Sequence, residues 1–365
     1  MFKYLFLIIL SCHGLIHLLG FIKAFNLAAV NQLTLPIPKA TGMLWFVTAL
    51  LFLATAGLFF LNKNLWWVPA MFGLLLSQLL IFTAWPDAKY GTVVNMVVLL
   101  VSIMGYGTWN FSSRYAQDVR SGLHESAMVP DSLLTEADLQ ALPEPVKNYL
   151  RYVGAVNQPK VRNFKVTFAG QIRKDEQSPW MPFTSEQYNF LQASTRLFFM
   201  QATMKFLPVA GYHRFVDGDA YMDIRLFSLF KVQNQSGKEM GIAETVTFFN
   251  DMCCMAPATL IDPRVKWLEV NGNQVRASFT NNDLSIFAWL TFNDQGQLIN
   301  FISEDRFATA ENGTMKRIPW STPLQDYRQM NGRMLPGYAD AIYHYPEGAF
   351  CYGNFRVIDV QYNCN

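Results

Sequence analysis

The first 113 residues of this 365-residue chain carry only six charges, and this constrains the fold more than any other feature. Nineteen uncharged residues separate Lys3 from Lys23, which is close to the length that a helix needs to cross a bilayer. Three further windows of this kind follow, and the four windows are residues 4–22, 40–62, 64–86 and 90–113. They predict a four-helix transmembrane domain at residues 1–111, with the lipid bilayer as its partner.

Charges in the loops indicate the orientation only weakly. With the N-terminus inside, the cytoplasmic side receives four basic residues and the other side receives three. The two groups are Lys3, Lys63, Arg114 and Arg120, against Lys23, Lys39 and Lys89. An even number of spans returns the chain to its starting side. We therefore expect a multi-pass protein of the bacterial inner membrane whose soluble part lies, by a small margin, in the cytoplasm.

Two histidines lie inside the first uncharged window, where polar groups are costly. His13 and His17 are four residues apart, so they share one helix face, which should point into the bundle. One interpretation is a metal, haem or quinone site, or a proton relay. The other is hydrogen bonding between helices, with Gln78 or Asn95 as partners.

The available ligands weigh against the first interpretation. The other windows contain no histidine, so an axial haem pair from two helices is not available. They also contain no carboxylate that would complete a metal site begun by two histidines. We therefore predict no cofactor and no metal, and the oligomeric state stays open.

The segment His13-Gly14-Leu15-Ile16-His17-Leu18-Leu19-Gly20 resembles the first helix of the DoxX-like family of small four-helix membrane proteins. That family commonly shows His-Gly, then Lys, then Leu-aromatic-Gly. Here His17 stands at the lysine position and Leu19 at the aromatic position. The resemblance implies four spans, and such proteins have been linked to envelope redox chemistry. A redox or quinone-linked protein that uses His13 and His17 is therefore one alternative function.

The composition changes after this region. Residues 112–141 are polar and are predicted to form a linker. In the remainder, residues 142–365, apolar residues alternate with polar ones, as in Phe164, Val166 and Phe168, which is typical of half-buried strands. Turn signals recur at Asp217-Gly218, Asn271-Gly272, Gln295-Gly296, Asn312-Gly313 and Asn331-Gly332. The pattern predicts an α+β domain with a mainly antiparallel sheet of about ten or more strands, which should curl.

One segment of the second half has helical spacing instead. Residues 243–256 place Val246, Phe249 and Cys253 on one face, and Pro257 should end the helix. We expect this embedded helix to cover the hollow of the curled sheet. Its acids, Glu244 and Asp251, lie two turns apart, or about 10.5 Å along the axis. They are the weak candidates for a second alternative function, a hydrolase, which requires both carboxylates in a cleft.

Aromatic residues and methionines are abundant in this half. They favour either a large packed core or an adaptable hydrophobic cavity within the sheet. The candidate ligand-binding residues are Phe198, Met200, Phe248 and Phe249. We interpret the chain as a membrane-tethered binding or carrier module for a lipid-like or other hydrophobic ligand, and whether it is an enzyme stays open. The near balance of 24 basic and 26 acidic residues beyond residue 110 argues against nucleic-acid binding.

The cysteines bear on the compartment. Cys253 and Cys254 are adjacent, which favours free thiols over a strained bond. Cys351 and Cys364 flank the last predicted strand region and are a possible disulfide if the compartment is oxidising. That pairing would place the soluble part outside the cell, against the loop charges.

A second resemblance covers about residues 142–363. Its motifs are Leu142-Pro143 with Pro145-Val146, Tyr149-Leu150-Arg151, Trp180-Met181-Pro182-Phe183, Met255-Ala256-Pro257-Ala258-Thr259-Leu260, Asp305-Arg306 and Pro319-Trp320. They resemble an uncharacterised bacterial family known only as a domain of unknown function. The resemblance implies a shared fold and supplies no activity or catalytic residue.

Overall fold

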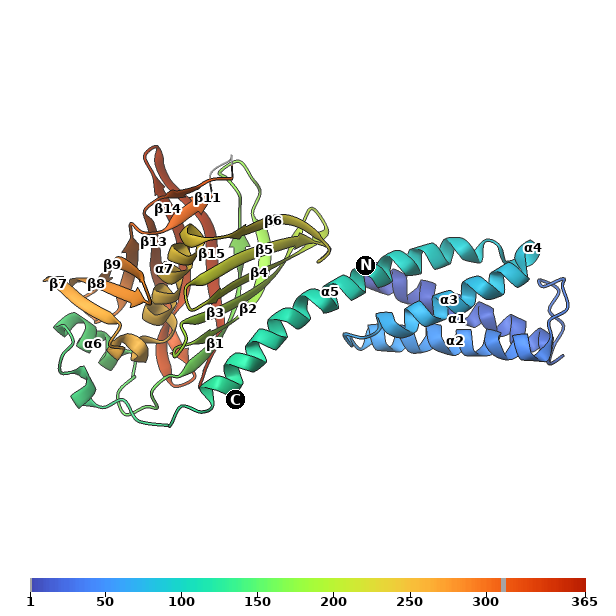
Figure 1. Cartoon of the computed structure of the whole chain (residues 1–365), viewed down its shortest axis with the longest axis horizontal. Helices are drawn as coiled ribbons and strands as arrows, with labels where there is room; N and C mark the ends of the chain where they lie inside the picture. Colours follow the sequence, from blue (N-terminus) through green and yellow to red (C-terminus); the bar gives the residue numbers. More distant parts are fainter. Residues whose placement is uncertain (1, 310–312) are drawn as a thin grey trace. The chain divides into compact units, whose positions relative to one another are not determined.

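The computed structural model describes residues 2–309 and 313–365, and Figure 1 shows its elements. The chain divides into two compact units, Met1–Ser113 and Arg114–Asn365. The longest helix, α5 (Gly91–Ser126), contributes to both units. It continues through the first part of the segment 112–141, so that part of the predicted linker is helical. The domain boundaries themselves stay predictions.

The first unit is helical. Besides the first part of α5 it contains α1 (Phe2–Ala24), α2 (Lys39–Phe60), α3 (Trp67–Thr83) and the short α4 (Trp85–Ala88). Three helices, α1, α2 and α5, are long and apolar enough to cross a membrane. The third predicted window forms α3, which is also apolar but only 17 residues long. The prediction of a helical region that could span a membrane is confirmed for three helices, and a fourth span is not confirmed.

Glycines bring α1 and α2 together. A Cβ atom added to Gly20 would lie 2.2 Å from a ring carbon of Trp45, and one added to Gly42 would lie 2.2 Å from the Cβ of Ala24. Real Cβ atoms do not approach this closely, so the two helices require glycine at these positions. This is the small-residue packing by which membrane helices associate.

The second unit is built on one 13-stranded sheet with antiparallel neighbours, as predicted. Its order is β6-β5-β4-β3-β2-β1-β15-β14-β13-β10-β9-β8-β7, and β11 and β12 form a separate pair. The strand bounds are β1 (Asn163–Ile172), β2 (Met181–Phe190), β3 (Thr195–Met204), β4 (Leu207–Val216), β5 (Asp219–Leu226), β6 (Phe230–Ser236), β7 (Val265–Asn271), β8 (Gln274–Asn281), β9 (Leu284–Phe292), β10 (Leu298–Ser303), β11 (Phe307–Thr309), β12 (Met315–Arg317), β13 (Trp320–Met330), β14 (Arg333–Tyr345) and β15 (Gly348–Tyr362).

Tight turns connect most of these strands. Asp217 and Gly218 have φ values of 52° and 99°, and Asn331 and Gly332 have 45° and 80°, as the Asp-Gly and Asn-Gly signals require. The register shifts between Thr167 and Phe168 on β1 and at four other places in the sheet. Such irregularities bend strands and increase their twist, which accounts for the curl visible in Figure 1. The predicted Asn312-Gly313 turn lies partly outside the described residues.

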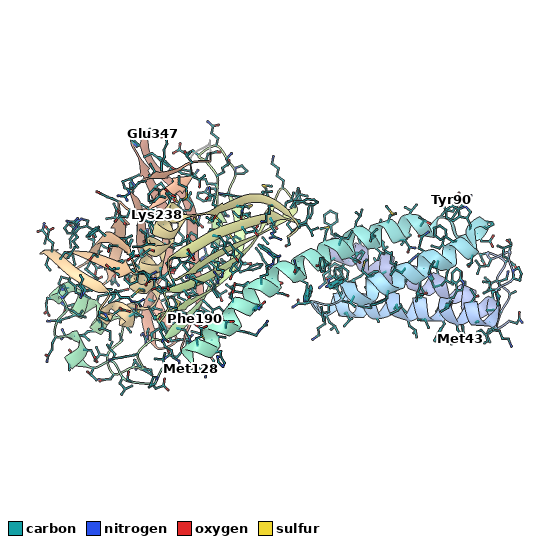
Figure 2. The ribbon with its side chains drawn as sticks, in the orientation of Figure 1. Met43, Tyr90, Met128, Phe190, Lys238 and Glu347 are labelled. Carbon is teal, nitrogen blue, oxygen red and sulfur yellow. The ribbon has the colours of Figure 1, made fainter. Side chains whose placement is uncertain are left out.

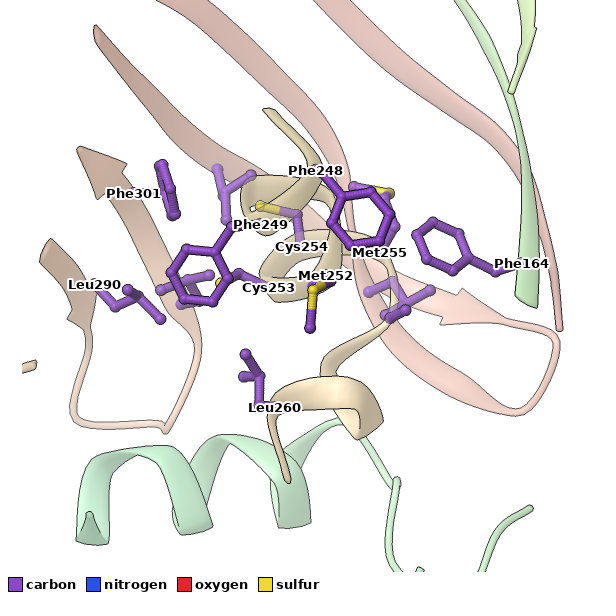
Figure 3. Packing of buried hydrophobic residues seen from close by; sticks show 14 of the residues in the cluster. Phe164, Phe248, Phe249, Met252, Cys253, Cys254, Met255, Leu260, Leu290 and Phe301 are labelled. Carbon is purple, nitrogen blue, oxygen red and sulfur yellow. The ribbon is translucent and has the colours of Figure 1, made fainter. Parts of the chain in front are cut away.

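The embedded helix is α7 (Lys238–Met255), which begins five residues before the predicted start. Every residue from Ala243 to Met255 is buried, because the curled sheet encloses the helix. Phe249 stacks on Phe279 of β8 with ring centroids 5.4 Å apart, and Phe248 packs against Phe215 of β4 at 5.9 Å. Figure 3 shows this core around the C-terminal half of α7. Three short helices, η1 (Glu136–Leu139), α6 (Glu144–Tyr152) and η2 (Pro257–Ile261), complete the unit.

Candidate functional site

The two buried acids of α7, Glu244 and Asp251, bind the same arginine. Arg196 points from β3 toward the helix, where its Nη1 donates to Glu244 at 2.9 Å and its Nε donates to Asp251 at 2.8 Å. Glu244 and Asp251 are seven residues apart, so both lie on the helix face that meets the sheet. A single guanidinium group therefore bridges two turns of α7.

Two amides of β2 complete the network around Asp251. Gln187 and Asn189 donate to the same carboxylate oxygen at 2.8 and 3.2 Å, and Gln187 accepts a bond of 2.9 Å from Arg196. Gln187 and Asn189 are two residues apart on β2, so their side chains lie on the same, inner face of the strand. The arrangement satisfies the charged groups that α7 brings into the core, as buried ion pairs require.

Arg306 and His213 lie near Glu244 on its other side. Arg306 Nη2 is 3.9 Å from Glu244 Oε1, and its guanidinium group lies 5.4 Å from the ring of Trp320. Its buried Nε has no hydrogen-bond partner among the described residues. The ring of His213, on β4, lies 5.6 Å from that of Phe198 on β3.

Burial and charge act in opposite directions on these groups. Burial raises the pKa of Asp251 above its ordinary value, and the bonds from Arg196 and Asn189 offset only part of that effect. Burial also acts to raise the pKa of Glu244, but the charges of Arg196 and Arg306 outweigh it and hold that pKa below its ordinary value. Burial lowers the pKa of His213 to about 4, so the imidazole is neutral at pH 7.

Glu244 and Asp251 therefore form a closed ion-pair network rather than an open pair of carboxylates. Only 1% of Glu244 and 7% of Asp251 are exposed. Sequence reasoning missed Arg196, Gln187 and Asn189. The sequence did offer one signal: Gln187 and Asn189 are polar at alternate positions of β2 that face inward, where apolar residues are usual.

The four predicted ligand-binding residues separate into two groups. Phe248 and Phe249 are fully buried and pack against other aromatic rings in the core. Phe198 and Met200 lie instead on the inner face of β3, on the same side as Arg196. All four side chains are buried members of one hydrophobic core cluster.

The predicted disulfide between Cys351 and Cys364 is wrong. Both cysteines are free, and Cys364 lies beyond the far end of β15, the strand in which Cys351 lies. The eleven residue-to-residue steps from Cys351 to Tyr362 span about 36 Å of extended strand. A disulfide needs Cα atoms within about 7 Å. This pairing therefore gives no reason to place the second unit outside the cell.

In the first unit, polar side chains form a buried cluster around the two histidines. His13 Nε2 lies 3.0 Å from Asn95 Oδ1, and His17 Nε2 lies 3.0 Å from the Ser77 hydroxyl. The other ring nitrogen of His17, Nδ1, is 2.8 Å from the carbonyl oxygen of His13. Asn95 also donates to Gln78 at 3.0 Å, so helices α1, α3 and α5 share one network. Among the described residues, no group of three or more His, Cys, Asp or Glu side chains is arranged to hold a metal ion.

The model of a family of unknown function, DUF6544, matches residues 132–355, which is more than half of the chain. The chain belongs to DUF6544. This confirms that the second unit is an uncharacterised domain, whereas the DoxX-like resemblance of the first unit stays a prediction. No curated protein matches the chain.

Solved structures show only distant likeness to this DUF6544 member. A LolA superfamily protein from Nitrosomonas europaea is 9% identical, with a TM-score of 0.30, over 60% of this chain and 93% of that protein. A DUF1329 family protein from Desulfovibrio piger is also 9% identical, with a TM-score of 0.34, over 60% of this chain and 91% of that one. Likeness at this level carries no argument about function.

Replacing Arg196 should destabilise the second unit strongly. The change Arg196→Met leaves buried Asp251 without its cation and leaves Glu244 only the more distant Arg306, which costs about 3–5 kcal/mol of unfolding free energy. Thermal unfolding of the full chain in detergent measures the loss. The matched control is Arg151→Met, because Arg151 pairs with Glu136 and Glu144 at the surface and its loss should change little. Equal unfolding temperatures for the two variants would contradict a stabilising network.

His213 should make stability depend on pH. Its pKa is about 4 in the folded chain and about 6.5 when unfolded, so between these values the unfolded chain binds a proton that the folded chain does not. Stability should therefore fall as the pH drops from 7 to 5. The variant His213→Gln should flatten this dependence, whereas His124→Gln at the surface should not. Identical unfolding profiles for His213→Gln and the wild type would refute the assignment.

Proposed function

We propose that the chain is a membrane-anchored module that binds a lipid-like or other hydrophobic ligand on the inner face of β3, β4 and β5. One observation carries the proposal. Beyond α7, this face consists of apolar and flexible side chains, and several of them are only partly buried. No catalytic step is part of the proposal.

The strand register defines that face. Arg196 and Phe215 are paired across β3 and β4, and both contact α7, so every second residue from them points inward. The next three rows toward the β3–β4 turn are Phe198, His213 and Met222; Met200, Gly211 and Ile224; and Ala202, Val209 and Leu226. The members on β5 are all partly exposed. Two methionines make the surface adaptable to an irregular apolar ligand.

The α7 helix meets the sheet at the opposite end of these strands. A Cβ atom added to Gly241 of α7 would lie 2.4 Å from the carbonyl oxygen of Gly218, in the β4–β5 turn. A Cβ atom added to Gly211 would meet only Ile224 and Met200, both at 3.6 Å, which is ordinary contact distance. A side chain at Gly211 would therefore begin with ordinary contacts, whereas the close approach at Gly241 leaves no space for one.

A polar group borders this apolar face. The charge of Arg306 acts on His213, which occupies the first of the three rows, and its Nε lacks a partner among the described residues. An amphipathic ligand would place its tail along Met200 and Ile224 and its polar head near Arg306. Such a division of apolar and polar contacts is usual in lipid and small-molecule sites.

The anchor belongs to the same proposal. Three helices are candidate spans, and we propose α3 as the fourth, which makes the DoxX-like first domain of residues 1–111 a four-helix bundle. Residues 112–141 then lead to the ligand-binding domain of residues 142–365. We propose the bacterial inner membrane as the location, and the loop charges lean slightly toward the cytoplasmic side for this domain.

Neither alternative function has a specific observation in its favour. A quinone-linked or redox role needs His13 or His17 to be available, yet both engage in hydrogen bonds within the helical unit. A hydrolase needs Glu244 and Asp251 in contact with water and substrate, yet Arg196 binds both. We retain the binding module because the β5 members of its face, Met222, Ile224 and Leu226, are apolar and partly exposed.

Filling the inner face should remove the ligand. In Gly211→Trp the indole projects among Met200 and Ile224 and competes with any apolar molecule there. We expect native mass spectrometry of the full chain to detect a bound hydrophobic molecule in the wild type and its loss in this variant. The control is Gln201→Trp, because Gln201 is exposed and lies on the outer face of β3. A molecule retained by Gly211→Trp, or absent from the wild type, would refute the proposal.

A further inference from the structure

Two neighbouring hairpin turns of the sheet expose large apolar side chains. In the β3–β4 turn, 89% of Phe206 is exposed, and just after the β5–β6 turn 64% of Phe230 is exposed. Each aromatic residue has a lysine beside it, Lys205 and Lys231. Soluble surfaces seldom display such side chains together without a partner.

The two turns lie side by side at one end of the sheet. The backbone amide of Phe227, in the β5–β6 turn, donates to the carbonyl oxygen of Pro208 on β4 at 2.9 Å. Figure 1 shows β4, β5 and β6 as adjacent strands, and Figure 2 draws the side chains on them as sticks. The exposed residues of both turns therefore form one surface, which we call the tip surface: Met204, Lys205, Phe206, Leu207, Phe230, Lys231 and Val232.

The backbone holds the tip surface in a costly conformation. Lys205 and Phe206 have φ values of 47° and 71°, and Phe227 and Ser228 have 55° and 57°. Bulky residues rarely adopt this left-handed region, for which glycine is the ordinary choice. Strain of this kind gathers at sites where a particular display of side chains is needed.

The last turns of α5 show which way this end of the sheet points. Gly122 packs against Phe190, since an added Cβ atom would lie 2.5 Å from that ring. Further back along the helix, Tyr115 stacks on Phe199 at 5.3 Å. Phe190 is paired with Thr195 at the start of β3, whereas Phe199 lies four residues along it. The direction along α5 from Gly122 back to Tyr115 is therefore the same as the direction of β3 from Thr195 toward the tip surface.

The helix α5 joins the unit that carries the tip surface to an uncharged stretch of chain. Arg114 precedes Tyr115 directly, and the uncharged stretch 90–113 lies on the other side of Arg114. Where α5 changes from a charged to an apolar helix, it enters the bilayer. The unit that carries the tip surface is therefore joined through α5 to a candidate membrane span, so a bilayer is an apolar partner to which the chain itself is tethered.

We propose that the tip surface inserts into the headgroup and upper acyl region of an anionic bilayer. Phe206, Leu207 and Phe230 would enter the apolar layer, while Lys205 and Lys231 would bind lipid phosphates. A second copy of the chain fits less well, because a symmetric contact would bring like-charged lysines together. The inference uses the membrane anchor of the proposed function and is independent of the ligand site.

Spin labelling of the full chain in vesicles tests this assignment. Nitroxides are placed by Phe206→Cys or Phe230→Cys in a background where Cys12, Cys351 and Cys364 are serine. The vesicles contain phosphatidylcholine with a minor fraction of phosphatidylglycerol. At each position we measure how often the label collides with oxygen, which concentrates in the bilayer, and with an aqueous nickel chelate. We expect the ratio of oxygen to nickel collisions to be severalfold higher at both positions than at a label in a water-exposed loop of the same chain.

The matched control is Asp217→Cys, in the exposed β4–β5 turn at the opposite end of β4. Its label should stay accessible to the nickel chelate in the same vesicles. Equal accessibility at positions 206 and 217 would overturn the proposal. Dipolar broadening between labels at position 206 of two copies, with no change in oxygen accessibility, would assign the surface to a second copy and would overturn it as well. Loss of the ligand in Gly211→Trp would not affect either outcome.

Discussion

The ion pairs of Arg196 with Glu244 and Asp251 are the interaction on which the second unit most depends. Hydrophobic burial is not directional, and the apolar side chains of α7 could pack against a curled sheet in more than one rotation. Two carboxylates two turns apart can share one guanidinium group in only one rotation and at one height. The cost of removing three charges from water is offset only in that geometry. The network therefore sets the position of α7, while the aromatic core supplies most of the favourable burial.

This position divides the inner face of the sheet into two parts. At the end near Gly218, α7 and its phenylalanines fill the space between the strands. At the other end, the same strands continue past the helix and present methionine, isoleucine and leucine side chains instead. His213 and Arg306 lie where the two parts meet. One helix thus makes the domain stable and leaves an apolar surface beside a buried charge, which is the combination that our proposed function uses.

The outer face of the same strands is used differently. The end of α5 packs there through Tyr115, which donates to Glu186 at 3.0 Å and stacks on Phe199. Tyr212 and Arg214 of β4 bind Asp118 of the helix at 2.7 and 3.2 Å. Alternate residues of β3 and β4 therefore face α7 on one side and α5 on the other. This explains why both faces of these strands are buried and why their apolar alternation is less regular than that of β8 and β9.

The amino-acid sequence by itself determined the features that depend on local patterns. Uncharged windows marked the membrane helices, alternation and tight turns marked an antiparallel sheet, and Pro257 marked the end of the embedded helix. These signals act over a few residues, so one chain suffices to read them. The short length of α3 and the extension of α5 through Ser126 were not evident, because helix ends depend on neighbouring contacts as well as on composition.

Only the tertiary structure decided which distant groups meet. Arg196 lies 48 and 55 residues from its two carboxylate partners, and no local period connects them. The same reason explains the error over Cys351 and Cys364, which are close in sequence but separated by the length of a strand. It also explains why Phe198 and Met200, which are buried in the same core as Phe248 and Phe249, lie on the strand face that the proposed site uses. Strand register and the placement of α7 settle these relations, and both arise from pairing between segments far apart in the chain.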